Sequence, residues 1–377
     1  MDDGNQTMAA SGHASGIRDA CIRVSRREGR HLVAIADLDS GHTVYDGEAF
    51  AAALYDDYVN RVCACCFRID TGKGFDVTCT RCRRVYYCSE ACRGQHRQSG
   101  AVGTVPHHLA CAALQRLGSL EEQGSELIKP RLIIEVMARR HHNSRRGDVQ
   151  LLVADEFESL EFHRPPDGWA DGDAEVDTYI QTWCEGLRDA IAACEGEWRP
   201  TVGELTNESI CAAASRIDVN GFDCLTAASG GESIGIGLYA GGASMFNHHC
   251  DPNCSIYLDR GLPSLVVKCN RAVKKGEKLT IAYLDVESYA DREERRERLR
   301  QRYCFECDCT RCVAQEAEEA ERAAAAAVPP RLLSRLHGHG AHYMLAAAIA
   351  GGGYWLSALL TLAAYFLVWM GVFNFPL

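Results

Sequence analysis

The chain begins without an apolar run and carries no excess of basic charge. Residues 1–16 are small and polar, so we find no secretory signal peptide and expect a disordered lead. The 40 Lys and Arg residues are outnumbered by 51 Asp and Glu, which gives a net charge of −11. Nucleic-acid binding relies on basic surface to neutralise phosphates, so we expect no direct nucleic-acid partner. An acidic protein is better suited to a basic protein or peptide substrate.

Cysteine is abundant, with 20 residues in 377. Without a signal peptide we expect a reducing compartment, in which thiolates stay free to bind zinc. Zinc takes four ligands in a tetrahedron, so four close pairs of ligands imply two ions. The pairs are Cys63 with Cys66, Cys79 with Cys82, Cys88 with Cys92, and His107 with Cys111. Cys65 is an alternative to Cys66, and His96 or His108 is an alternative to His107.

Three later segments carry most of the remaining polar chemistry. Residues 247–253 (NHHCDPN) place two amides, two imidazoles and a thiol directly after an apolar pair. Side chains this rich in donors and acceptors are usually arranged to hold a polar ligand, because buried polar groups are costly unless paired. Residues 276–283 (GEKLTIAY) predict a turn and a strand that end on Tyr283, and residues 303–312 (YCFECDCTRC) form a second cysteine-rich segment.

In this order the three segments resemble the NHxCxPN, GExLTxxY and post-SET CxCxxC motifs of SET and MYND domain-containing protein lysine methyltransferases. The earlier cysteine pairs, with Tyr87 before the third, resemble a MYND finger. The resemblance covers residues 17–312. It implies an α+β protein, with a β-rich SET fold of knotted short strands split by a zinc-binding MYND finger and a helical insert, and with a post-SET zinc region.

The implied order begins with an N-terminal SET part at 17–62, a MYND finger at 63–111 and a helical insert at 112–215. It continues with the SET core at 216–285, the post-SET region at 286–312, a linker helix at 313–342 and a hydrophobic tail at 343–377. Local patterns predict strands over 17–50 and helices over 125–140, 177–194 and 316–326. A capping box at Thr201–Glu204 predicts a further helix through Ser215. We expect the charged helix at 288–302 to present a solvated face.

The resemblance implies methyl transfer from S-adenosylmethionine to the side-chain amine of a protein lysine, in a histone or another protein. The catalytic residues would be Tyr283, which orients the methyl donor and the amine, and Tyr303 and Tyr239, which line the lysine channel. The cofactor ligands would be Gly29, Asn220, Asn247, His248 and Phe305. His31 stands where the family carries a second glycine near the cofactor. A lysine has a pKa of about 10.4, so the site must favour its neutral form.

The resemblance also assigns the metal ligands, as three structural zinc ions. Two lie in the finger, one held by Cys63, Cys66, Cys88 and Cys92, the other by Cys79, Cys82, His107 and Cys111. The third lies in the post-SET region, held by Cys250, Cys307, Cys309 and Cys312. His249 is either a competing ligand or a neutral orienting residue. The finger implies a peptide or protein partner, and its arginines form either a docking patch or, as we favour, a solvated face.

The C-terminal end differs from that of similar proteins, which continue into a helical repeat domain. Residues 343–377 contain no charged residue. The segment 354–373 matches the ~20 residues that a membrane-spanning helix needs, which favours a tail anchor on a cytoplasmic protein. The alternatives for the tail are an apolar helix pair packed on the body and an aberrant terminal exon, and the alternative location is the nucleus. The rival function is a MYND-type interaction adaptor, either free or membrane-tethered, whose SET core has lost turnover.

Overall fold

The computed structural model describes residues 6–8, 16–98, 105–121, 126–145, 157–163, 174–194, 205–225, 232–257 and 264–327. The chain divides into two compact units, Met1–Cys309 and Thr310–Leu377, and α9 (Thr310–Ala327) is the described part of the second. Within the described residues, no helix is both long and apolar enough to cross a membrane. The tail at 343–377, predicted as an anchor, lies outside those residues.

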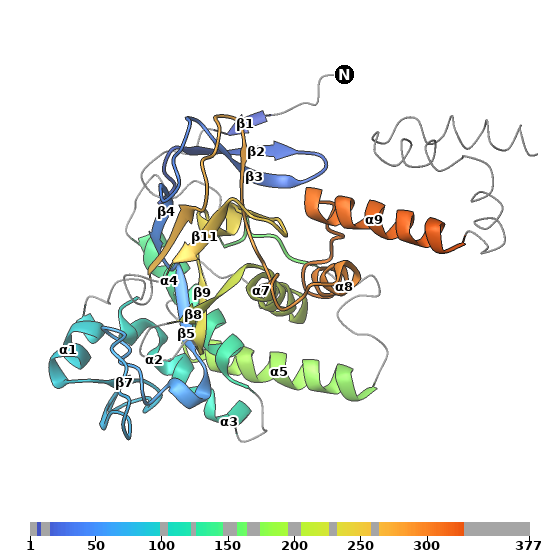
Figure 1. Cartoon of the computed structure of the whole chain (residues 1–377). Coiled ribbons are helices and arrows are strands. Elements are labelled where there is room, and N and C mark those ends of the chain that lie inside the picture. The colour runs from blue at the N-terminus through green and yellow to red at the C-terminus, as the bar shows by residue number, and fades with distance from the viewer. Residues whose placement is uncertain are drawn as a thin grey trace, which may run out of the picture. The chain divides into compact units, whose positions relative to one another are not determined.

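Short strands in four sheets form the β part of the first unit (Figure 1). The largest sheet has the order β1-β2-β3-β13-β10, and the others have the orders β11-β12-β4, β5-β9-β8 and β6-β7. The strands are β1 (Gln6–Met8), β2 (Ala20–Ser25), β3 (Gly29–Ala34), β4 (Thr43–Glu48), β5 (Ala51–Leu54), β6 (Val77–Thr78), β7 (Tyr86–Tyr87), β8 (Gly221–Leu225), β9 (Ser233–Leu238), β10 (Asn247–His248), β11 (Cys254–Tyr257), β12 (Ser264–Cys269) and β13 (Lys278–Ile281).

Most of the helices lie between β5 and β8 in chain order, and η4 and α8 come later. They are η1 (Asp56–Tyr58), α1 (Glu90–Gln98), α2 (His107–Arg116), α3 (Gly118–Glu121), α4 (Ile128–Arg145), α5 (Ala174–Ala192), α7 (Asn207–Asn220), η4 (Ala243–Met245) and α8 (Arg292–Tyr303). Fully buried residues such as Ile133 of α4, Leu187 of α5 and Ile217 of α7 share one hydrophobic cluster. Burying each of these side chains stabilises the fold by about 1.5–3 kcal/mol. The same cluster contains Ala53 of β5 and Leu238 of β9, so the helical insert packs against the strands of this sheet.

A second hydrophobic cluster holds the β part together and positions the polar segments. Leu32 of β3, Leu279 of β13 and Phe246 are buried in it. β13 pairs antiparallel with β3 and parallel with β10, so that Asn247 lies opposite Thr280. This pairing brings the 247–253 and 276–283 segments side by side. The mixed α and β architecture confirms the predicted fold class.

Two local predictions need correction. The disordered lead is wrong for residues 6–8, which form β1 and satisfy the otherwise open edge of β2. The capping box predicted at Thr201–Glu204 lies outside the described residues. Within them, the helix that reaches Ser215 begins at Asn207, and Thr206 and Ser209 form its capping box, in which the Thr206 hydroxyl accepts from the Ser209 N–H.

The charged helix α8 does not present only a solvated face. Arg295 and Arg296 are 0% and 6% exposed. Their burial is compensated by hydrogen bonds: Arg295 donates to the Tyr289 and Ala290 carbonyls, and Arg296 donates to the Cys307 carbonyl at 3.0 Å. The run of charged residues therefore includes two buried arginines: Arg295 holds the turn before α8, and Arg296 holds the cysteine-rich segment after it.

Candidate active site and metal centres

Tyr283 is attached to the 246–248 segment through both its backbone and its side chain. It follows β13 by two residues, and its N–H donates to Nδ1 of His248 at 3.0 Å. Its hydroxyl donates to the Phe246 carbonyl at 2.7 Å. Burial raises the pKa of Tyr283, so the hydroxyl stays protonated at neutral pH.

Three aromatic rings from two other segments gather around Tyr283. The Tyr303 ring centroid lies 4.8 Å away, and those of His248 and Phe305 lie 5.5 and 6.4 Å away. The Tyr303 hydroxyl donates to the Tyr283 carbonyl at 3.4 Å. Burial lowers the pKa of His248 to about 4, so its imidazole is neutral at physiological pH. The result is a largely apolar cluster with protonated hydroxyls.

Tyr239, the third predicted channel residue, lies deeper in the core. It is 2% exposed, and its ring meets that of Phe222 edge-on at 5.6 Å. Burial raises its pKa well above the ordinary value. Tyr239 belongs to the hydrophobic cluster on which Tyr283 packs, so the structure brings all three predicted tyrosines to one region.

The β2–β3 turn lies against Asn247. The Asn247 amide donates to the Glu28 carbonyl at 3.1 Å. Gly29, the next residue, has a φ of +60°, a left-handed conformation that favours glycine, and a Cβ added there would meet nothing within 4 Å. His31 is 5% exposed, and its Nδ1 lies 3.2 Å from the Gly29 carbonyl. Two predicted cofactor residues, Gly29 and Asn247, are therefore neighbours beside an open turn.

Asn220 is engaged elsewhere. It ends α7, is 8% exposed, and its amide nitrogen donates to the Glu161 and Arg216 carbonyls, both at 2.8 Å. The 157–163 segment that it holds is also bound by Arg30 of β3, through the Ser159 carbonyl. Asn220 thus anchors a segment that crosses toward the β2–β3 turn, and its amide nitrogen is directed to Glu161 and Arg216 rather than to the aromatic cluster.

Asn253, the second amide of the 247–253 segment, is engaged within the fold rather than left open to a ligand. It is 2% exposed. Its amide nitrogen donates to the Lys278 carbonyl at 2.6 Å and to the Glu277 carboxylate at 3.2 Å, while its oxygen accepts from the Thr280 N–H at 2.9 Å. It joins the end of the 247–253 segment to β13. The only sequence signal was its position as the last residue of that segment.

Two groups of four ligands meet in the finger. They are Cys63, Cys66, Cys88 and Cys92, and Cys79, Cys82, His107 and Cys111, each group with ligand atoms within 4.8 Å of one another. Zn–S bonds of about 2.3 Å in a tetrahedron place two sulfurs about 3.8 Å apart. The sulfur separations are 3.6 Å for Cys66 and Cys88 and 3.7 Å for Cys79 and Cys111. Both groups therefore fit a tetrahedral metal site.

The two C-x2-C turns have the same backbone shape. Phe67 and Arg83, each directly after its pair, have a φ of +54°, and each donates its N–H to the first cysteine's carbonyl. A residue other than glycine is held in this left-handed conformation only when its surroundings require it. The repeated turn directs both sulfurs of each pair toward one metal site.

The alternative ligands Cys65, His96 and His108 lie outside the two groups of four. Cys65 is buried and is not one of the four grouped with Cys66. Nδ1 of His96 lies 3.2 Å from the Tyr87 hydroxyl, and burial lowers the pKa of His96 to about 3. Nδ1 of His108 lies 3.0 Å from the Arg97 carbonyl. His107 is therefore the histidine ligand of its group, and its Nε2 lies 3.4 Å from the Cys82 sulfur.

A third cluster lies beside the aromatic rings. Cys250, Cys307 and Cys309 are buried, and the Cys250 and Cys307 sulfurs are 3.9 Å apart. Cys312, the fourth predicted ligand, belongs to the first turn of α9, in the second unit. Nδ1 of His249 accepts the Asp251 N–H at 2.9 Å, so this imidazole orients the turn after Cys250.

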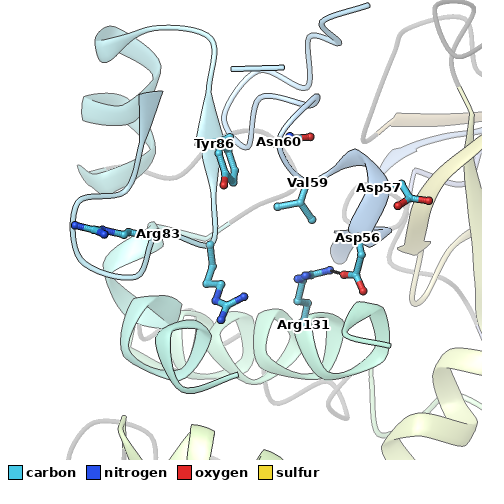
Figure 2. A pocket seen from close by; sticks show the side chains of 8 residues that line it. Asp56, Asp57, Val59, Asn60, Arg83, Tyr86 and Arg131 are labelled. Atoms are coloured by element: carbon cyan, nitrogen blue, oxygen red, sulfur yellow. Dashed lines mark hydrogen bonds and ion pairs between the residues drawn. The ribbon is translucent and has the colours of Figure 1, made fainter. Parts of the chain in front are cut away.

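A separate polar cavity of about 380 Å³ opens between the finger, η1 and α4 (Figure 2). Figure 2 shows Arg131 of α4 reaching Asp56 of η1, with which it forms an ion pair. Arg83 follows the second C-x2-C turn, which fixes its backbone. The cavity is lined by Asp56, Asp57, Val59, Asn60, Arg83, Arg84, Tyr86 and Arg131. It contains none of the predicted catalytic or cofactor residues.

Comparison with known proteins agrees with this arrangement. A family model of the SET domain matches residues 29–284. The chain is 28% identical to histone-lysine N-methyltransferase SMYD3 of Mus musculus, over 77% of this chain and 60% of that protein. It is 24% identical to N-lysine methyltransferase SMYD2 of Homo sapiens, over 78% of this chain and 60% of that protein. It thus spans less than two thirds of either relative. Because the SET match covers more than half of it, the chain belongs to the SET domain family.

Proposed function

We propose that this protein transfers a methyl group from S-adenosylmethionine to the side-chain amine of a protein lysine. The observation that carries the proposal is the meeting of three motif segments: Asn247–His248, Tyr283, and Tyr303 with Phe305. Two similar proteins are named as lysine methyltransferases. The aromatic rings and protonated hydroxyls suit a narrow channel that admits a lysine side chain.

The residues present fit the cofactor. The open, left-handed turn at Gly29 lies beside the amide of Asn247, and the half-exposed ring of Phe305 lies 6.1 Å from that of His248. An amide and backbone groups suit the amino-acid end of the cofactor, and an aromatic face suits its adenine. S-adenosylmethionine, when bound, supplies an electrophilic methyl group on a sulfonium. We propose that Asn220 acts indirectly, by holding residues 157–163 near this turn.

The chain's own residues must then orient and deprotonate the lysine. Tyr283 is held by two hydrogen bonds, so its hydroxyl has a fixed place near the channel. Apolar surroundings disfavour the charged amine and lower the pKa of the lysine. Tyr239 and Tyr303 would line the channel and exclude water, which favours in-line transfer. No covalent intermediate with the protein is needed.

We propose zinc as the metal of all three cysteine clusters, one ion in each. Thiolate sulfur and imidazole nitrogen are the donors that structural zinc prefers. The sulfur separations of 3.5–3.9 Å in the clusters support this choice. For the third site we retain Cys312 as the fourth ligand. The ions are structural, because each cluster is made of four protein ligands and leaves no open position.

The cavity beside the finger supports a finer proposal, that an acidic peptide segment of a partner docks there. Arg131 and Asp56 form an ion pair in its lining, which leaves two finger arginines, Arg83 and Arg84, against the single carboxylate of Asp57. The lining therefore has a net positive charge, which suits an acidic segment. Fluorescence anisotropy with an acidic peptide tests this. Arg83→Glu should weaken binding about tenfold, as expected for a charge-assisted contact. Arg97→Glu, outside the cavity, should not, and equal weakening by both would refute the docking site.

The main proposal is tested by methyl transfer to lysine-containing proteins with labelled S-adenosylmethionine. Wild-type chain should label a lysine substrate, and Tyr283→Phe should lose most of this activity. If the folded, zinc-loaded chain binds the cofactor but labels no substrate, an interaction adaptor becomes the better account.

A further inference from the structure

His248 lies between the third cysteine cluster and Tyr283. Its Nδ1 is 3.0 Å from the Tyr283 backbone nitrogen, and its Nε2 is 3.3 Å from the Cys250 sulfur. Both ring nitrogens are therefore engaged, in opposite directions. The residue comes from β10, next to β13, the strand that Tyr283 follows by two residues.

The two contacts fix the tautomer. A backbone N–H can only donate, so Nδ1 must accept from Tyr283 and carries no proton. In a neutral imidazole the proton then resides on Nε2, which donates to the Cys250 sulfur. A sulfur bound to a metal is a thiolate, and a hydrogen bond to a charged acceptor is about twice as strong as a neutral one.

We infer that His248 is a positioning residue that links the post-SET metal cluster to the catalytic tyrosine: it orients the Cys250 sulfur through Nε2 and fixes the Tyr283 main chain through Nδ1. This role rests on the proposed function and adds to it. The ordering of the metal cluster is transmitted through one ring to Tyr283, whose hydroxyl is then held by the Phe246 carbonyl. A displacement of about 1 Å at a reacting group can cost roughly a hundredfold in rate.

The neighbouring imidazole provides a contrast. Nδ1 of His249 accepts the N–H of Asp251, two residues along the same turn, and this contact does not connect the cluster to Tyr283. Both histidines directly precede Cys250, and of the two it is His248 whose imidazole accepts from Tyr283. His249→Ala is therefore a matched control for loss of an imidazole beside Cys250.

Two substitutions separate the contacts, because the amide of Asn reaches the position of Nδ1 and that of Gln reaches the position of Nε2. The readouts are the affinity of the most weakly held zinc, by chelator competition, and the Tyr283 amide resonance in [15N]tyrosine-labelled protein, assigned with Tyr283→Phe. His248→Asn should lower the zinc affinity about tenfold. It should leave the Tyr283 resonance near its wild-type position once zinc is added. His248→Gln should keep zinc affinity within about threefold and shift the resonance.

Activity adds a third readout. The single-turnover rate of His248→Asn should rise with added zinc, whereas that of His248→Gln should stay about a hundredfold low at any zinc concentration. Removing zinc from wild type should shift the Tyr283 resonance, and His249→Ala should not. Equal effects of Asn and Gln on both zinc and the resonance, or no effect of either, would overturn the link. If wild type shows no turnover while the zinc and resonance effects separate as stated, the proposed function fails and the link stands.

Discussion

The two asparagines at the ends of the 247–253 segment should respond to alanine substitution in opposite ways. Asn253 is 2% exposed and its side chain makes five hydrogen bonds, to Lys278, Glu277, Cys254 and, twice, Thr280. Asn247 is half-buried and its side chain makes one, to the Glu28 carbonyl. Asn253 therefore stabilises the fold, and Asn247 keeps hydrogen-bonding capacity for a ligand.

The magnitudes follow from these contacts. A buried hydrogen bond contributes about 1 kcal/mol net, and a partner left unsatisfied costs about 1–3 kcal/mol. Asn253→Ala leaves the Thr280 N–H and the Lys278 carbonyl without their partner, so we expect a loss of about 2–4 kcal/mol in unfolding free energy. Asn247→Ala should cost about 1 kcal/mol or less. Its main effect should be on cofactor affinity, about tenfold or more, because a polar ligand loses its amide partner.

The assay is urea unfolding followed by circular dichroism at fixed zinc, beside calorimetric titration with S-adenosylmethionine. Asn253→Asp serves as a matched variant. It keeps the oxygen that Thr280 contacts and places a carboxylate against the Lys278 carbonyl and the Glu277 carboxylate, so it should be at least as unstable as Asn253→Ala. The reasoning is refuted if Asn247→Ala destabilises as much as Asn253→Ala, or if it leaves cofactor affinity unchanged.

Three further predictions concern the tyrosine, one carboxylate and the finger. Tyr283→Phe should lower the single-turnover rate about a hundredfold with little change in cofactor affinity, as for loss of one positioned donor; a loss of affinity of the same size would contradict this. Partial burial alone would raise the pKa of Glu277, but hydrogen bonds from Arg271, Lys274 and Asn253 lower it below the ordinary value. Its stabilisation, about 1 kcal/mol, is therefore present above pH ~4.3 and lost as pH falls through the lowered pKa. Unfolding of Glu277→Gln should differ from wild type at pH 7 and converge with it in acid; a constant difference would refute the assignment. Cys66→Ala should lose one zinc by elemental analysis while Cys65→Ala keeps the wild-type content, and the reverse would exchange the two ligands.

Much of the site could be predicted from the sequence because its chemistry is concentrated in short motifs. Closely spaced cysteines must meet around one ion, so the grouping of Cys63, Cys66, Cys88 and Cys92 follows from ligand chemistry and family order. Tyr283 was assigned through the resemblance of residues 276–283 to the GExLTxxY motif, because a tyrosine at the end of a strand does not by itself identify a catalytic residue. These features depend on local spacing.

Other features depend on contacts that lie outside these motifs. The pairing of β1 with β2 could not be predicted from small polar residues, because an open strand edge accepts any extended segment. The burial of Arg295 depends on the carbonyls of Tyr289 and Ala290 turning toward it, which no charge pattern reveals. Asn220 matched a motif position, but the 157–163 segment occupies its amide nitrogen.

The most direct test of the account is calorimetric titration of the full, zinc-loaded chain with S-adenosylmethionine, beside Asn247→Ala. The account predicts saturable binding at a single site by the wild type, weakened about tenfold or more by Asn247→Ala. A folded, zinc-loaded wild-type chain that binds no S-adenosylmethionine would contradict it.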